Sequence, residues 1–317
     1  MSENMIIGNI DVLQSSESIT EELYRRFIAY IDAKPKTIEV YTRAIRQFAG
    51  YLTENNIDKP VREDILAFRS YLKETGHKPA TIQNYITVTR RFFQWTAQEG
   101  IYPDVAEHVK GAVIGREHKK DYLTGKQAKA VLENVDCSEL KGIRDYAILL
   151  LMITGGLRNI EVVRANIEDM RTVGNDTVLF IQGKGRDEKG EYVKITIETE
   201  VAIREYLKAR DNINPEQPLF VSMSNNSKGK RLSTRTVSGI VKSRLRAAGF
   251  DSDRLTAHSL RHTAVTLSLL GGESLQSVQQ FARHGNLNTT MIYAHNLERA
   301  ENTCESTIAK SIFTEDD

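Results

Sequence analysis

The spacing of apolar residues changes along the chain and divides it into segments. Residues 1–17 are polar and show little periodicity, which predicts a flexible tail. Over residues 18–104, apolar residues recur every three or four positions, which is the spacing of amphipathic helices. Pro35, Pro60 and Pro79 fall near the start of successive helical segments, where proline is tolerated. These patterns predict a compact four-helix domain.

A second domain is expected over residues 123–317. Residues 105–122 break the helical rhythm with glycines and a basic run, which predicts an interdomain linker. Thr124 is a candidate helix N-cap. The apolar stretch Ile143–Ile153 predicts a buried helix.

The rest of the second domain alternates between strand and helix patterns. Thr177–Ile181 and Tyr192–Ile197 are rich in β-branched and aromatic residues, and the glycine-rich GKGRDEKG between them predicts a hairpin turn. Further helices are predicted over Glu198–Arg210, Ser233–Ala248, His258–Leu270, Ser274–Ala282 and Leu297–Ile312. The expected fold class is therefore mainly α with a small antiparallel β-sheet.

The amino-acid composition indicates which classes of protein fit this chain. The chain has 317 residues, of which 40% are hydrophobic and 27% charged, which is enough for a packed core. The apolar run Ala147–Ile153 is too short to cross a bilayer, and the acidic N-terminus lacks the basic region of a secretory signal. Cys137 and Cys304 show no metal-binding spacing, which favours a reducing cytoplasm.

The net charge of +1 conceals local basic clusters. No acidic residue lies between Glu216 and Asp251, a stretch that includes Lys230, Arg231, Arg235 and Lys242. Two more clusters contain Lys119 and Lys120, and Lys36, Arg43 and Arg46. The plainer interpretation is that these side chains only solvate exposed helices. Three clusters together favour a polyanionic partner.

Two glycine-containing motifs carry cations. In TGGLRNIE, two glycines precede Arg158, and Glu161 follows at the spacing of one helical face. A simple surface ion pair is the alternative. In GKG, Lys184 stands at the expected hairpin and could act as a general acid or a phosphate clamp. The alternative is a turn lysine that serves solubility.

The motif AHSLRHT combines histidines with an arginine. His258 and Arg261 share a helical face near a helix N-terminus, which suits a phosphate. His258 and His262 have a spacing that could hold zinc, but Ser259 stands where zinc hydrolases need glutamate. The remaining alternative is a buried histidine that bonds to the backbone.

The motif RHGNLNTTMIY contains the last two candidates. His284 and Tyr293 flank a turn and a short helix that begins near Asn288. Most tyrosines are core or interface residues. A tyrosine becomes a credible nucleophile only when cations and a proton acceptor converge on it.

Taken in order, these motifs resemble those of the tyrosine recombinase (phage integrase) family, in particular its two-domain Xer-type members. TGGLRNIE resembles that family's first arginine box, and GKG its hairpin lysine. HSLRH resembles its His-x-x-Arg box, and His284 stands nine residues before Tyr293, which is the family's spacing. The resemblance covers roughly residues 18–312. It departs from the family at Arg283, where glycine is usual, and at Lys194, where proline is usual.

The resemblance implies a fold and a reaction. A helical core-binding domain and an α+β catalytic domain would close around duplex DNA. Tyr293 would attack the scissile phosphate and form a 3′-phosphotyrosine, while Arg158, Arg261 and His284 stabilise the phosphorane. His258 would accept the phenol proton and Lys184 would protonate the departing 5′-oxygen. Neither a metal nor another cofactor is expected.

The resemblance also implies partners. The chain would act on a double-stranded DNA recombination site, through a Holliday junction, as a homo-tetramer with a dimer at each site. An accessory or partner recombinase would fit, and a membrane would not. The C-terminal helix, with Ile308 and Ile312, would dock onto a neighbouring protomer. Cytoplasmic, nucleoid-associated localisation follows.

The DNA contacts are expected from basic and aromatic side chains. Candidates on the fourth helix are Tyr85, Arg90 and Arg91. They join the basic clusters, whose candidates are Lys36, Arg43, Arg46, Lys119, Lys120, Lys230, Arg231, Arg235 and Lys242. Three alternatives stay open: a type IB topoisomerase, a catalytically silent DNA-binding regulator on the same fold, and a zinc hydrolase.

Overall fold

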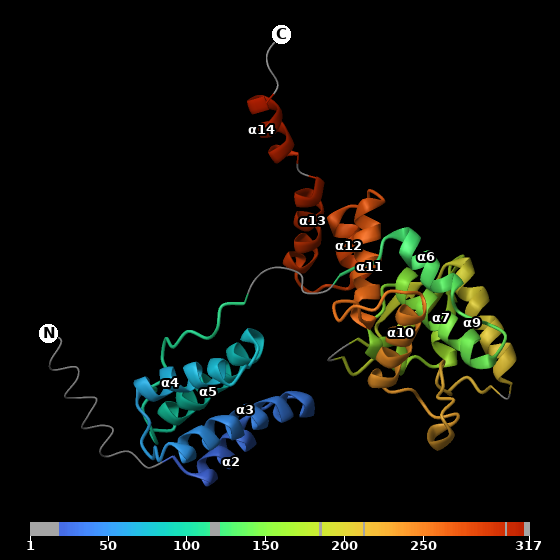
Figure 1. Cartoon of the computed structure of the whole chain (residues 1–317). Coiled ribbons are helices and arrows are strands. Elements are labelled where there is room, and N and C mark those ends of the chain that lie inside the picture. The colour runs from blue at the N-terminus through green and yellow to red at the C-terminus, as the bar shows by residue number, and fades with distance from the viewer. Residues whose placement is uncertain (1–18, 115–120, 184–185, 212, 302, 314–317) are drawn as a thin grey trace. The chain divides into compact units, whose positions relative to one another are not determined.

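The computed structural model describes residues 19–114, 121–183, 186–211, 213–301 and 303–313. The chain forms two compact units, residues 1–117 and 118–317. Each unit has its own hydrophobic core. Figure 1 shows the elements of both units.

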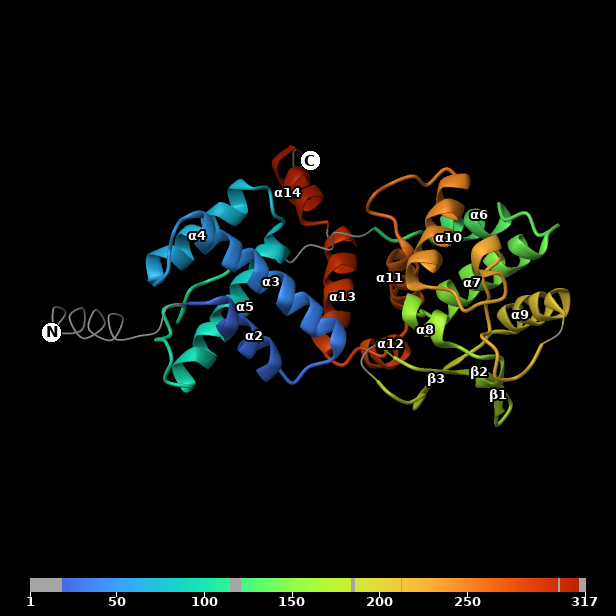
Figure 2. The same cartoon turned by 90° about the horizontal axis from the view of Figure 1, so that it is seen from below.

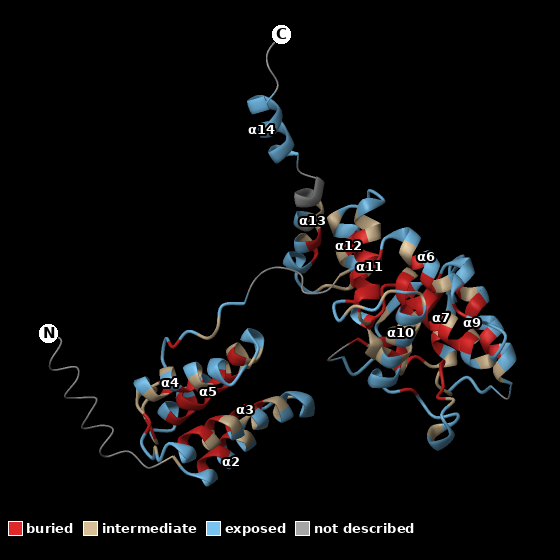
Figure 3. Cartoon of the chain, viewed as in Figure 1, coloured by how far each residue is buried: buried red, intermediate tan, exposed pale blue. Residues whose placement is uncertain are grey.

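The described part of the first unit contains the four predicted helices. They are α2 (Glu21–Tyr30), α3 (Pro35–Glu54), α4 (Arg62–Glu74) and α5 (Pro79–Gln98). Prolines occupy the first position of α3 and α5, where the missing N–H has no helical partner to lose. The buried residues line the inner faces of the helices (Figure 3).

Aromatic rings fill the core of the first unit. The rings of Phe48 and Phe68 meet edge to face with centroids 5.1 Å apart, and Phe93 meets Phe48 edge to face at 5.8 Å. Within the segment 105–122, which the sequence suggests is a linker, Ala106 and Val109 are also buried in this core. The first part of that segment therefore packs with the helices.

The second unit is mostly helical and contains a small sheet. Its helices are α6 (Gly125–Glu133), α7 (Leu140–Thr154), α8 (Asn159–Arg164), α9 (Ile197–Arg210), α10 (Thr234–Ala247), α11 (Ala257–Leu270), α12 (Leu275–Ala282), α13 (Leu287–Glu301) and α14 (Cys304–Phe313). Short 3₁₀ turns occur at Ile167–Asp169 and Asn225–Ser227. The strands are β1 (Met170–Val173), β2 (Asp176–Ile181) and β3 (Glu191–Lys194).

Helix α7 forms the centre of this unit. Every residue from Ala147 to Ile153 is buried, because α9 and α11 pack against it. At its start, the carboxylate of Asp145 accepts hydrogen bonds from Arg144 and from Arg244 of α10, so the buried charges are paired. The capping prediction for α6 is confirmed, since the Thr124 hydroxyl accepts a hydrogen bond from the Gln127 N–H.

The three strands form an antiparallel sheet in the order β1-β2-β3 (Figure 2). The predicted hairpin between β2 and β3 is present, with Leu179 opposite Val193. Strand β1 was not predicted, because its four residues are mostly exposed and carry no alternating pattern. The mainly helical fold class with a small antiparallel sheet is confirmed.

Two predicted boundaries were wrong. The second hairpin strand ends at Lys194 rather than Ile197, because the Thr196 hydroxyl caps the start of α9. The helix predicted over Leu297–Ile312 is two helices, α13 and α14. The carbonyl of Thr303 accepts a hydrogen bond from the Thr307 N–H, so a new helix begins there with threonine in the capping position.

Candidate active site

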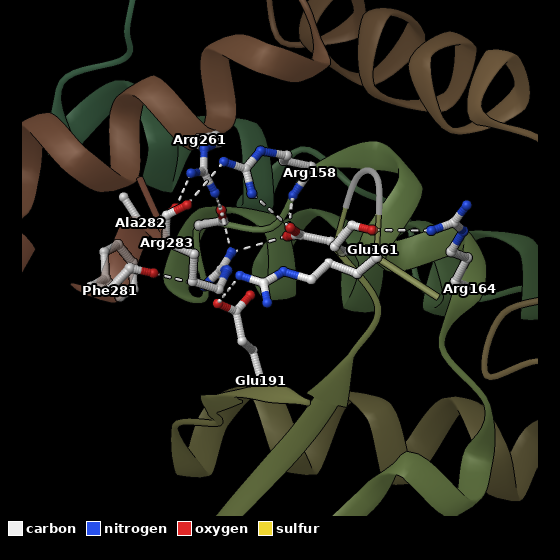
Figure 4. Close-up of polar contacts among 11 residues, drawn as sticks. Arg158, Glu161, Arg164, Glu191, Arg261, Phe281, Ala282 and Arg283 are labelled. Atoms are coloured by element: carbon white, nitrogen blue, oxygen red, sulfur yellow. Dashed lines mark hydrogen bonds and ion pairs between the residues drawn. The ribbon is translucent and has the colours of Figure 1, made fainter. Parts of the chain in front are cut away.

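The loop between α7 and α8 provides the backbone of the site. Gly156 has a φ of +58°, and a Cβ at this position would lie 3.0 Å from the Phe281 ring. Only glycine meets both demands without strain. The Gly156 carbonyl accepts hydrogen bonds from Arg261 Nη1 at 2.6 Å and from Arg283 Nη2 at 3.1 Å. One peptide group therefore anchors two guanidinium groups (Figure 4).

Arg158 is held by Glu161 at the start of α8. One Glu161 oxygen accepts from the Arg158 backbone N–H at 2.8 Å, and the other accepts from Arg158 Nη1 at 2.8 Å. Glu161 is fully buried, while 29% of the Arg158 side chain is exposed. Burial raises the pKa of Glu161, but Arg283 and then Arg158 outweigh burial and bring the pKa below its usual value. Glu161 is therefore a carboxylate at neutral pH.

Arg261 lies on α11 and is only 1% exposed. Its guanidinium donates to the Gly156 carbonyl and to the Ala282 carbonyl at the end of α12. Burial, then the positive charges of Arg158 and Arg283, lower the pKa of Arg261 to about 9. Arg261 is therefore still cationic at neutral pH, and its orientation is fixed by two backbone oxygens.

His284 follows α12 and is oriented by α13. Its Nδ1 lies 2.9 Å from the hydroxyl of Thr290, a buried residue, and its carbonyl accepts from the Gln279 side chain at 3.2 Å. Burial, then Arg261 and Arg158, lower the pKa of His284 to about 4. The imidazole is therefore neutral at pH 7 and can donate one hydrogen bond.

Replacing His284 with glutamine is expected to reduce the stability loss that acid causes. The unfolded imidazole binds its proton near pH 6.5, whereas in the fold burial, and then the facing groups Arg261, Arg158, Arg283 and His258, lower that pKa to about 4. As pH falls between these values the unfolded state binds more protons, so stability falls. Urea unfolding of both proteins at about pH 7 and pH 4.5 measures the difference. Equal losses in both would contradict this account.

Tyr293 lies on α13 and is 6% exposed. Its ring is stacked on the His284 ring at 6.3 Å, and the His262 ring lies 5.1 Å away. His262 meets the exposed His258 edge to face at 4.6 Å. Burial raises the pKa of Tyr293 to about 12, although Arg261 and Arg158 oppose the rise. The phenol is therefore protonated at neutral pH.

The hairpin beside the site holds the next candidate. Lys184 lies outside the described residues, as do Lys119 and Lys120. Gly183, immediately before Lys184, is anchored because its carbonyl accepts from Arg164 Nη1 at 3.1 Å. The base of the hairpin loop is therefore joined to α8.

Eight of the predicted DNA-contacting cations are exposed in their own units. They are Lys36, Arg43, Arg46, Arg90, Arg91, Lys230, Arg231 and Arg235. Arg43 and Arg46 also line a hollow of about 770 Å³ along α3, together with Thr42 and Gln47.

Two candidates of the first unit are held in intramolecular contacts. Tyr85 is 8% exposed, and its ring lies 5.8 Å from that of His77. Arg91 donates to the Tyr41 hydroxyl and lies over its ring. Little of Tyr85 is therefore available to a base.

Two candidates of the second unit are also engaged. Arg231 donates to the Val163 carbonyl at 2.7 Å, which joins its segment to α8. Lys242 donates to the Ser252 carbonyl at 2.6 Å. These contacts indicate that both side chains help to hold the fold of this unit together.

The structure adds site residues that the sequence motifs did not single out. Thr290 orients His284, and nothing in the sequence distinguishes this threonine from its neighbours. Arg164 holds the hairpin base. Arg283 was noted only as a departure from a family pattern, and the structure places its side chain among the site residues.

The described residues contain neither a metal-ligand cluster nor a membrane-spanning helix. Within the described ranges, no group of three or more His, Cys, Asp or Glu residues could hold a metal ion. No helix in the described part of the chain is long and apolar enough to cross a membrane.

Comparisons with known proteins agree on one family. Residues 121–299 match the phage integrase family, and residues 21–102 match the phage integrase N-terminal SAM-like domain. The tyrosine recombinase XerC of Pelobacter propionicus is 32% identical over 268 residues, covering 82% of this chain and 85% of that protein. A tyrosine recombinase of Synechococcus elongatus is 28% identical over 289 residues, covering 87% of this chain and 89% of that one.

Solved structures show the same fold. The XerH site-specific recombinase bound to a palindromic difH substrate, in a post-cleavage complex, has a TM-score of 0.72 at 21% identity, covering 87% of this chain and 81% of that one. A lambda integrase dimer (residues 75–356) bound to a COC′ core site has a TM-score of 0.67 at 17% identity, covering 86% and 97%.

Proposed function

Because this chain belongs to the phage integrase family, the tyrosine recombinases, we propose that it is a site-specific DNA recombinase that cuts and rejoins strands through a 3′-phosphotyrosine. One observation carries this proposal. Arg158, Arg261, His284 and Tyr293 come from four separate segments, and they converge around the Gly156 loop and α13. This set combines cations, a neutral donor and a phenol.

Each residue has a role that its surroundings support. Arg158 and Arg261 would hold the non-bridging oxygens of the scissile phosphate, since guanidinium groups match paired phosphate oxygens. Neutral His284 would donate a hydrogen bond to the same phosphate. The Arg261 fork is already oriented by backbone carbonyls, so little reorganisation would accompany the reaction.

Tyr293 would be the nucleophile and needs help to lose its proton. With a pKa near 12, only about one phenol in 10⁴ is ionised at pH 8. We assign His258 as the proton acceptor and Lys184 as the donor to the departing 5′-oxygen. Because Tyr293 is 6% exposed, DNA binding must open its surroundings before attack.

The substrate would be a double-stranded recombination site. We propose a dimer on each site and a homo-tetramer across two sites, with strand exchange through a Holliday junction. Helix α14 supports the assembly, because Ile308 is 58% exposed and Ile312 is 66% exposed, which suits docking on a neighbouring protomer. Integration, excision, resolution and inversion all fit this reaction, with or without an accessory or partner recombinase.

The domain roles and the location follow from the same proposal. Residues 18–104 would be the core-binding domain, residues 105–122 the linker and residues 123–317 the catalytic domain. DNA contacts are proposed for the exposed cations Lys36, Arg43, Arg46, Arg90, Arg91, Lys230, Arg231 and Arg235. Lys119 and Lys120 join them. The site of action would be the cytoplasmic nucleoid.

Covalent capture tests the function. The protein would be mixed with nicked suicide duplexes tiled from the DNA that flanks its own gene, and then run on a denaturing gel. We expect an adduct whose tryptic peptide, residues 284–299, carries the nucleotide on Tyr293. Native-gel binding without an adduct would instead favour a catalytically silent DNA-binding regulator. Relaxation of supercoiled DNA without strand exchange would favour a topoisomerase, an alternative that the reported relatives do not support.

A further inference from the structure

Arg283 has a backbone conformation that arginine rarely adopts. It caps the C-terminus of α12 with φ 53° and ψ 46°, in the left-handed region. Glycine is the default residue for such a cap because it has no Cβ. An arginine that accepts this strain needs a compensating interaction, so its side chain is informative.

The Arg283 side chain points inward and is 6% exposed. Its Nη1 donates to the Phe281 carbonyl at 2.7 Å. Its Nη2 donates to the Gly156 carbonyl at 3.1 Å and to Glu161 Oε2 at 3.0 Å. Figure 4 shows this guanidinium beside Glu161. Its Nε is buried and has no hydrogen-bond partner among the described residues. The group is therefore fixed by three acceptors but not fully satisfied.

These acceptors also hold the two arginines assigned to the phosphate. The Gly156 carbonyl accepts from Arg261 as well as from Arg283. The Glu161 carboxylate pairs with both Arg158 and Arg283. In addition, the backbone carbonyl of Arg283 accepts from Arg158 Nη2 at 3.3 Å. Arg283 thus contacts an anchor of each phosphate-binding arginine.

The guanidinium groups of this site repel one another, so their arrangement depends on the Glu161 carboxylate, which pairs with Arg158 and Arg283. Three guanidinium groups lie around the single carboxylate of Glu161, and two of them are buried. Burial lowers the pKa values of both Arg261 and Arg283, the positive charge of Arg158 lowers both further, and the Glu161 carboxylate opposes these effects. Held together in this way, the guanidinium groups concentrate positive charge in one region. That charge would stabilise the extra negative charge of the phosphorane transition state.

We propose that Arg283 is a positioning residue for DNA cleavage: it fixes the Gly156 peptide and the Glu161 carboxylate, and through them it holds Arg261 and Arg158 against the scissile phosphate. This inference rests on the proposed function. Glycine at this position would leave the backbone conformation intact and would remove the guanidinium.

The test compares Arg283→Gly, Arg283→Lys and the wild type on the captured duplex. Cleavage would be measured in single turnover on the normal phosphodiester and on a duplex with a methylphosphonate at the mapped scissile position. The methyl group removes one phosphate charge, so the reaction depends less on well-placed cations. Arg210→Ala is the matched control, because Arg210 also bonds to backbone, at Pro218, in the same unit.

We expect Arg283→Gly to cleave the phosphodiester about 10- to 100-fold more slowly than the wild type, as for a reacting group displaced by a fraction of an ångström. On the methylphosphonate the difference should shrink to a few-fold. The cleavage rate of Arg283→Lys should lie between those of the wild type and Arg283→Gly, because lysine keeps the positive charge but lacks the paired N–H donors of the guanidinium. Arg210→Ala should cleave both duplexes at the wild-type rate.

Two results would overturn the positioning role. One is Arg283→Gly cleavage at the wild-type rate on the phosphodiester. The other is an equal loss on both duplexes, which would mean a general loss of folded protein. Failure of the proposed function would look different, because the wild type itself would then form no Tyr293 adduct on any duplex.

Discussion

A protein with Tyr293 replaced by phenylalanine is expected to bind the capture duplex and to form no covalent adduct. The substitution removes one oxygen from a ring that is 6% exposed, stacked on His284 and in tilted contact with His262. The ring contacts remain, so the fold of α13 should remain too. Because Tyr293 is the proposed nucleophile, adduct formation should fall to background in the denaturing gel.

Tyr206→Phe is the matched control for this result. Tyr206 is fully buried in the same unit, and its hydroxyl accepts a hydrogen bond from the Val221 N–H at 3.3 Å. Its loss should lower stability by about 1 kcal/mol and leave capture unchanged. An adduct that persists in Tyr293→Phe would show that another residue attacks the phosphate, and the assignment of Tyr293 would be wrong.

The predicted helices are confirmed where the sequence carries a local signal, such as an apolar run or a proline at the helix start. The apolar stretch Ile143–Ile153 lies within α7, and proline at the first position marks the starts of α3 and α5. These signals are local, because side-chain periodicity and a missing N–H act within a few residues. Strand β1 lacks such a signal, since it is held by pairing with β2 rather than by its own pattern.

In the site, too, local contacts could be predicted from the sequence and long-range contacts could not. Arg158 and Glu161 could be paired from sequence, because three positions on a helix bring side chains together. The joint anchoring of Arg261 and Arg283 by Gly156 could not be predicted from the sequence. Both arginines are more than a hundred positions from that glycine, and they meet it only through the packing of α7, α11 and α12. The inward direction of Arg283 depends on a left-handed backbone that no arginine pattern predicts.

Replacing Arg261 with lysine is expected to slow cleavage by about 10²- to 10³-fold, which corresponds to about 3–4 kcal/mol of transition-state stabilisation. The guanidinium donates to the carbonyls of Gly156 and Ala282 while its remaining N–H groups can face a phosphate. A lysine ammonium is a single point on a flexible stem and cannot span both carbonyls and the phosphate. Single-turnover capture on the normal phosphodiester measures the loss.

The loss of cleavage rate in Arg261→Lys should also depend on pH. In this position burial, then Arg158 and Arg283, lower the pKa of the arginine to about 9 from a usual value above 12. A lysine starts from about 10.4, so the same surroundings would bring its pKa toward neutrality. Acidification would then restore its charge, and the ratio of wild-type to Arg261→Lys rates should fall as pH is lowered from about 8 to 6.

Arg210→Lys separates this effect from a general intolerance of lysine. Arg210 also uses its fork on a backbone carbonyl, that of Pro218, and on the side chain of Gln217. It lies on α9, and its hydrogen bonds go to Pro218, Leu219 and Gln217, so capture by Arg210→Lys should match the wild type. A wild-type rate in Arg261→Lys would mean that charge alone suffices, and the oriented fork would have no part in cleavage.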